Sequence, residues 1–203
     1  MTETSLSLLS RLQKSPESGS WNRINDLYAP LLRTWLRRYD VQPSDTDDLV
    51  QEVLLAVAND VGNFKHAGRP RAFRAWLKGI LVNRLRKFWR ARGRRPQAQG
   101  DSDLAARLAQ LDDATSELSR IWDRDHDQQV LRQLMALAEP HFEPATWTAF
   151  SRVALDGAQP DEVAEELGIS RNAVIISKCR VLSRLRQESD GLIDSASDFF
   201  AKN

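Results

Sequence analysis

The sequence predicts an all-α protein: two small helical domains joined by an acidic linker, the second carrying a helix-turn-helix. Apolar residues recur at steps of three and four through most of the 203 residues, and no convincing strand alternation occurs. Charge is sorted into acidic and basic blocks although the formal net charge is only +1. A stretch rich in Gly, Pro and Gln follows the first group of helices. We expect domains at 1–96 and 125–190, a linker at 97–124 and a tail at 191–203.

The first domain is predicted to begin with helices over about 6–12, 21–36 and 44–57. Pro30 lies inside the second of these patterns and is expected to kink or divide that helix. Ser44 with Asp47 forms a capping-box variant at the start of the third helix. In the acidic linker, periodicity is weak, so we expect docked or transient helix there and no separate core.

The segment 64–96 holds twelve Lys and Arg residues and no Asp or Glu. Its apolar residues stand at helical spacing, which predicts a helix with one buried face and one basic, aromatic-edged face. Such a helix most often meets nucleic acid or an acidic membrane surface; a solvated face that only aids solubility is the alternative. No apolar run reaches membrane-spanning length and no signal pattern opens the chain, so we expect a cytoplasmic protein that binds nucleic acid.

The second domain is predicted to contain helices over about 130–137 and 144–155, followed by a helix-turn-helix. Pro160 suits a first helical turn, Gly168 suits a left-handed helix end and Ser170 suits the N-cap of the next helix. Val174 would anchor that helix inward, and Ile176 is expected to pack inward as well. An ordinary helical hairpin inside a core is the alternative interpretation.

Enzymatic chemistry is not indicated. Cys179 is the only cysteine, which excludes a disulfide framework and a cysteine-based metal cluster. His66, His126 and His141 are scattered without metal-ligand spacing. The sequence shows neither clustered carboxylates for a metal nor a Gly-rich phosphate loop, so we predict no catalytic residue, metal or cofactor.

Three motifs together resemble a known family. They are Asp-Asp-Leu-Val-Gln-Glu-Val-Leu-Leu at 47–55, Phe-Arg-Ala-Trp-Leu-Lys-Gly-Ile-Leu-Val-Asn-Arg-Leu at 73–85, and the helix-turn-helix. Over roughly residues 5–188 the chain resembles a bacterial sigma factor of the extracytoplasmic-function (group 4) class of the sigma-70 family, and its last helix looks like a planctomycete-type subgroup. The resemblance implies a non-enzymatic protein that binds core RNA polymerase and directs promoter recognition, DNA melting and transcription initiation.

The resemblance also implies three binding surfaces. The acidic helix would dock on the β′ clamp helices of the polymerase through Asp47, Asp48, Leu49, Gln51 and Glu52. The basic segment would hold the melted minus-ten element, with a flipped base in its preceding loop, through Asn63, Phe64, Lys65, His66, Arg69, Arg71, Arg74, Lys78, Asn83, Arg84, Lys87 and Arg90. The helix-turn-helix, beside the polymerase β flap, would read the minus-thirty-five duplex through Ser170, Arg171, Asn172, Ile175, Lys178 and Arg180.

Several points stay open at this stage. Trp76 is expected in the core, whereas Trp89 is divided between the core and stacking on DNA. The linker would thread toward the polymerase active-site and RNA-exit region. Three kinds of inhibitor of the sigma factor stay open: an anti-sigma protein, the C-terminal tail, or acidic segments folded onto the basic helix. A stand-alone helix-turn-helix regulator that binds DNA as a homodimer is the alternative function, but no dimerisation or sensing domain is evident.

Overall fold

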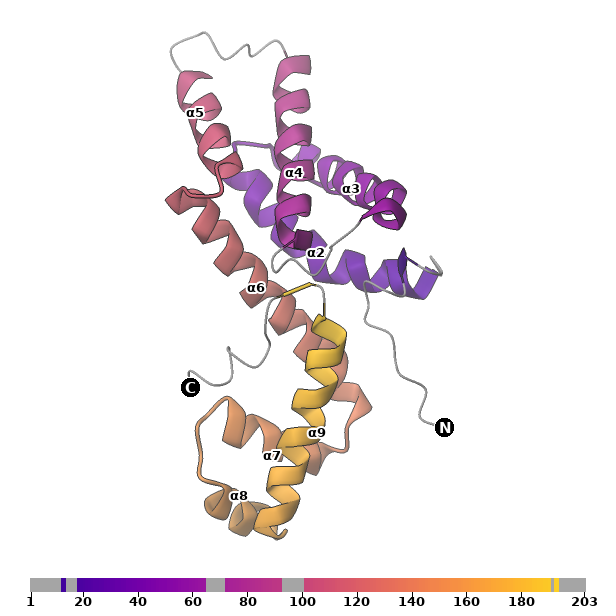
Figure 1. Ribbon diagram of the computed structural model, residues 1–203, viewed down its shortest axis with the longest axis vertical. Helices are drawn as coiled ribbons and strands as arrows, with labels where there is room; N and C mark the ends of the chain where they lie inside the picture. Colours follow the sequence, from indigo (N-terminus) through magenta and orange to yellow (C-terminus); the bar gives the residue numbers. More distant parts are fainter. Residues whose placement is uncertain (1–11, 14–17, 65–71, 93–100, 191, 194–203) are drawn as a thin grey trace. The chain divides into compact units, whose positions relative to one another are not determined.

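The computed structural model describes residues 12–13, 18–64, 72–92, 101–190 and 192–193, and within these ranges it contains helices and no β-strand (Figure 1). The all-α prediction is therefore confirmed. The elements are α2 (Ser18–Arg38), α3 (Pro43–Asp60), η1 (Val61–Asn63), α4 (Ala72–Ala91), α5 (Asp101–Asp112), α6 (Glu117–Ala138), η2 (Glu139–His141), α7 (Pro144–Ala154), α8 (Pro160–Leu167) and α9 (Arg171–Ser189). Of the predicted helix at 6–12 only Leu12 is described, and it is helical; of the predicted tail at 191–203 only residues 192–193 are described.

The chain divides into two compact units, with the boundary between Val130 and Leu131. The first unit contains α2, α3, η1, α4, α5 and the first half of α6. The second contains the second half of α6 and the elements from η2 to α9. The segment that the sequence marked as a linker is thus mostly helical where it is described, with a non-helical connection at 113–116, and its described residues belong to the first unit.

The core of the first unit lies where α2, α3 and α4 pack together (Figure 1). Each helix contributes an apolar stripe at steps of three and four, the arrangement that buries one face of a helix. The fully buried side chains include Leu27, Leu32, Trp35, Val53, Leu77, Leu81 and Leu85. Because α4 also packs against α5, its inner face is covered on two sides.

One local prediction in this unit was wrong, and another was correct at most in part. Pro30 does not divide the predicted helix, because α2 continues without interruption from Ser18 to Arg38; a kink at Pro30 stays a prediction. The third helix begins at Pro43, with Gln42 as its N-cap, so Ser44 lies inside the helix and does not cap it. Proline at the first position needs no amide hydrogen bond and has the φ of a helix, which explains why the helix starts one residue earlier.

The second unit is built around a small apolar cluster of Ala149, Val163, Ala164 and Val174, with Ile169 packed at its edge. Gly168 ends α8 at φ +63°, a backbone conformation that glycine adopts without steric cost. The Ser170 side chain accepts a hydrogen bond from the Ala173 amide at 3.1 Å and caps α9. The local predictions for Pro160, Gly168, Ser170 and Val174 are confirmed.

Candidate polymerase-binding and nucleic-acid-binding surfaces

The acidic surface of α3 presents Asp47, Asp48, Gln51 and Glu52 to solvent, whereas Leu49 is buried. Leu49 therefore holds the helix in the unit and is not reachable by a partner in this structure. Two of the acids already meet cations of neighbouring helices. Arg33 pairs with Asp47 at 2.8 Å, and Arg84 of α4 pairs with Glu52 at 3.4 Å. Both pairs are exposed, so a partner's cations can replace them at little cost.

An apolar groove of about 520 Å³ opens between α2 and α3, directly beside Gln51. Its lining residues are Trp21, Asn22, Ile24, Asn25, Gln51, Leu54, Leu55 and Ala58. Leu55 is 61% exposed, an unusual state for a large apolar side chain on a helix. Apolar centres with polar or charged rims are typical of protein–protein interfaces. These apolar lining residues were not predicted as part of the site. The signal in the sequence was Leu55, a large apolar residue that lies off the buried stripe of its helix.

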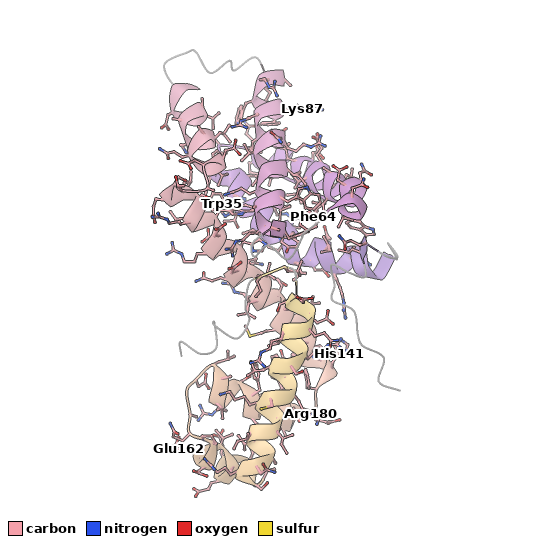
Figure 2. All side chains as sticks on the ribbon, in the orientation of Figure 1. Trp35, Phe64, Lys87, His141, Glu162 and Arg180 are labelled. Carbon is pink, nitrogen blue, oxygen red and sulfur yellow. The ribbon has the colours of Figure 1, made fainter. Side chains whose placement is uncertain are left out.

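The outward face of α4 carries Asn83, Lys87 and Arg90, which are exposed and lie at helical steps of four and three. Figure 2 marks Lys87 near the C-terminal end of this helix. Arg84 and Arg86 flank the face and are partly buried. An amide and several cations on one exposed helical face can bind nucleic-acid bases and phosphates.

Arg74 and Lys78 occupy a different face of α4. The sequence analysis placed them with the DNA-binding residues, but they are only 2% and 7% exposed. Arg74 forms ion pairs with Asp123, at 3.3 Å, and with Asp127 of α6. The Lys78 ammonium donates a hydrogen bond to the Ser119 hydroxyl, and burial lowers the pKa of Lys78. In this structure neither cation is accessible to DNA.

The start of the loop before α4 is aromatic. Asn63 is exposed, and the ring of Phe64 stacks on Trp76 with 4.8 Å between the ring centroids. Trp76 is partly buried, so it is in the packed layer with one edge open. Trp89 is buried, and this settles its position in the core. The predicted loop residues Lys65, His66, Arg69 and Arg71 lie outside the described residues.

The exposed surface of α9 combines polar, cationic and apolar side chains. Arg171 pairs with Asp161 of α8 at 3.1 Å, and both side chains remain largely in solvent. Asn172 and Arg180 are exposed, Lys178 is partly buried, and Figure 2 marks Arg180 on this helix. Ser170 is also exposed, but its hydroxyl is used by the helix cap.

The prediction that Ile176 packs inward was wrong. Ile176 is 48% exposed and its neighbour Ile175 is 38% exposed, because the inward positions are taken by Val174, Ser177 and Val181. The helical period places residues 174, 177 and 181 on one face, so residue 176 falls outside it. Cys179 is exposed on the same helix.

His126 of α6, to which the sequence assigned no role, is buried. The ring of His126 is fully buried beside Tyr28 and Trp122, with centroid distances of 5.6 and 6.4 Å. Its Nδ1 lies 2.9 Å from a carboxylate oxygen of Asp127. Burial lowers the pKa of His126, and the hydrogen bond and charge of Asp127 only partly oppose this effect. The structure thus favours the neutral imidazole.

The described ranges contain no group of three or more His, Cys, Asp or Glu side chains arranged to hold a metal ion. In the same part of the chain, no helix has both the length and the apolar character needed to cross a membrane.

Within the described residues, the protein is all-helical, with one acidic helical face on α3 and basic side chains exposed on α4 and α9. Residues 26–95 match the family model of sigma-70 region 2. The chain is 26% identical over 162 residues to RNA polymerase sigma factor HrpL of Pseudomonas syringae pv. syringae, covering 79% of this chain and 82% of that protein. It is 35% identical over 77 residues to a probable RNA polymerase sigma factor of Haemophilus influenzae, covering 36% and 38% of the two chains.

The match to region 2 over residues 26–95 and the similarity to two sigma factors support the function of a sigma factor that directs transcription initiation. The first unit contains the whole matched region, including α3 and α4, so the acidic face of α3 and the basic helix α4 both lie in region 2.

Proposed function

We propose that this sigma factor belongs to the group 4 class and uses its two units for two promoter elements. In this assignment α3 docks on the β′ clamp helices of core RNA polymerase. The exposed face of α4 and the loop before it hold the melted minus-ten strand. The α8–α9 pair reads the minus-thirty-five duplex. The observation that carries the proposal is that the two basic helices belong to separate compact units, each with a core of its own.

The polymerase-docking surface is supported by charge and shape together. Asp48 and Glu52 are exposed on α3, and the groove around Leu55 supplies apolar area next to them. An acidic rim beside an apolar centre suits a helical partner with arginines beside leucines. We therefore extend the predicted docking residues from the acids to Trp21, Leu54 and Leu55.

The strand-holding surface is supported by the exposed row of Asn83, Lys87 and Arg90 on α4. Cations follow phosphates, and amides and rings meet unstacked bases. Phe64, at the start of the loop, and Trp76 of α4 form a stacked aromatic pair on which an extruded base would stack.

The duplex-reading surface is supported by the capped helix α9 and its exposed side chains. Asn172 can bond an adenine edge, and Arg180 can bond a guanine edge or a phosphate. The exposed Ile175 and Ile176 have no polar group to offer, so they suit the methyl groups of thymines. Their exposure is therefore useful on a DNA-reading helix, although it is unfavourable in water.

Run-off transcription with the host's core polymerase tests the proposal. The double substitution Asp48→Lys and Glu52→Lys should weaken core binding on the order of a hundredfold, because two exposed acids become like charges facing cations. Asp60→Lys is the matched control, since Asp60 is an exposed acid at the end of the same helix. Unchanged core binding by the double variant would refute the docking surface. A stand-alone regulator would instead bind duplex promoter without polymerase.

A further inference from the structure

The inner face of α4 is covered by an acidic segment of the same unit. We call this segment the cover. It consists of α5 (Asp101–Asp112) and the first half of α6 (residues 117–130). It engages α4 at Arg74, Lys78 and Arg86, three cations of the basic segment. Arg74 meets Asp123 and Asp127, Lys78 meets Ser119, and Arg86 meets Asp112 at 3.0 Å.

The cover also rests on α2. The rings of Trp122 and Trp35 meet edge to face at 5.1 Å, and His126 lies against Tyr28. Outside these rings, Arg38 pairs with Asp125 at 3.2 Å. Apolar burial therefore supplies the attraction, and the ion pairs fix the register.

Within the described part of the chain, four buried polar atoms at this contact have no hydrogen-bond partner. The Tyr28 hydroxyl, the Trp35 and Trp122 indole nitrogens and His126 Nε2 are buried there without a hydrogen bond. Buried groups in that state cost stability, and each of these four regains water when the cover leaves. All four lie at the contact between α2 and α6.

The buried charges at the contact also indicate an interaction of modest strength. Arg74 and Lys78 are removed from water, and a buried ion pair returns little net stability after this loss. The arrangement is specific in geometry and modest in strength, which suits a contact that forms and breaks. A permanent core would be expected to fill these positions with apolar side chains.

We propose that the cover is a detachable autoinhibitory element that sequesters Arg74 and Lys78 in the free protein and leaves α4 when core RNA polymerase binds. The proposal rests on the proposed function, because it regulates the strand-holding helix named there. Arg74 and Lys78 stand one helical turn apart on α4. Once exposed, they add two phosphate contacts, and the acids that repelled DNA move away with the cover.

A reversible lock tests whether the cover must leave. In a Cys179→Ser background, Arg38→Cys with Asp125→Cys puts two accessible thiols on α2 and α6, and a reducible bis-maleimide joins them. The matched control, Glu117→Cys with Arg120→Cys, carries the same cross-link within α6 alone, where these two exposed residues pair at 3.4 Å. The locked protein should give less than about one tenth of the run-off transcript of its reduced form. Equal transcription by the locked and reduced forms would overturn the proposal.

A second variant opens the cover without polymerase. Asp123→Asn with Asp127→Asn removes the charges of the two carboxylates that pair with Arg74, and the probe is a fluorescent single-stranded oligonucleotide of mixed sequence. The free variant should bind it on the order of tenfold more tightly than the parent chain, with a salt slope steeper by about 1 to 2. Should circular dichroism show loss of helix, Asp123→Asn alone leaves Asp127 beside Arg74 and gives the same test. No change in affinity or slope would contradict the proposal.

The two proposals fail in different ways. An unmodified chain that does not support initiation with its host's core polymerase refutes the proposed function. A chain that initiates normally while locked refutes only the cover, because the same protein then acts as a sigma factor with residues 117–130 still attached.

Discussion

The two basic helices of this protein differ in how their charge is held. On α4, Arg74 and Lys78 are buried against α6. Arg84 and Arg86 on this helix, and Arg92 directly after it, each meet a carboxylate from another element. On α9, Asn172 and Arg180 face solvent, and the ion pair between Arg171 in its first turn and Asp161 of α8 is itself exposed. The helix proposed to read duplex DNA is ready to bind, whereas the helix proposed to hold the melted strand is partly neutralised.

That difference fits the order of steps in initiation. Duplex recognition comes before strand separation, so a free protein gains nothing from an open strand-holding surface. Such a surface would also bind unrelated nucleic acid through its phosphates, because that attraction is independent of sequence. Covering α4 while leaving α9 open limits this binding without weakening duplex recognition.

The largest expected effect separates the functions of the two helices. Lys87→Glu with Arg90→Glu reverses two exposed charges on α4 and should reduce promoter opening by the holoenzyme on the order of a hundredfold. Permanganate reactivity of thymines at the minus-ten element measures opening, and footprinting at the minus-thirty-five element should remain. Arg120→Glu on α6 is the control for charge reversal at an exposed arginine. Equal loss of both signals would remove the distinction between the helices.

A smaller effect concerns pH and the cover. Burial lowers the pKa of His126 below its usual value of 6.5, so the docked cover prefers the neutral ring, despite Asp127 and Asp123, which favour the charged form. Docking is therefore strongest above pH 6.5 and weakens as the pH falls from there toward the depressed pKa of the docked state, by at most about tenfold per pH unit. The charge of Arg74, which acts on the same ring, also lowers the pKa of His126.

Single-stranded DNA binding by the free protein, measured from pH 7.5 to 5.5, reports this release. Binding should strengthen toward low pH in the parent chain more than in His126→Gln, which has a neutral polar side chain at all these values. Identical pH profiles for the two proteins would show that His126 does not control the cover.

The smallest expected effect concerns the isoleucines of α9. Replacing thymine by uracil in the minus-thirty-five element removes one methyl group, and losing its contact should cost about 0.8 kcal/mol, or roughly fourfold in affinity. Ile175→Ala with Ile176→Ala should bind both DNAs equally. A uracil effect that persists in the alanine variant would assign the methyl contact to another side chain.

Much of the architecture followed from local signals in the sequence. Proline, glycine and serine at 160, 168 and 170 fixed the short helix, the turn and the cap of the second unit, because each residue acts through its own backbone preference. Periodicity identified α3 and α4. It could not tell which cations of α4 face outward, since a long Lys or Arg side chain reaches solvent or a carboxylate equally well.

The features that sequence analysis missed depend on contacts between distant segments. Asp123 and Asp127 were assigned to a linker and to the second domain, yet they pair with Arg74, some fifty residues earlier. Nothing near His126 in the sequence indicates that its ring lies against Tyr28. The groove beside Leu55 likewise forms only when α2 packs on α3.

Thiol labelling at position 119 tests directly whether the cover leaves α4 when core RNA polymerase binds. Ser119 is buried on α6 against Lys78, so Ser119→Cys in the Cys179→Ser background should react slowly in the free protein. In the complex with core polymerase, this cysteine should be labelled at least about tenfold faster than in the free protein, because release of the cover exposes it. The control is Thr115→Cys, which lies exposed on the preceding turn and should label rapidly in the free protein. Slow labelling of Cys at position 119 in a transcriptionally active complex would contradict the account.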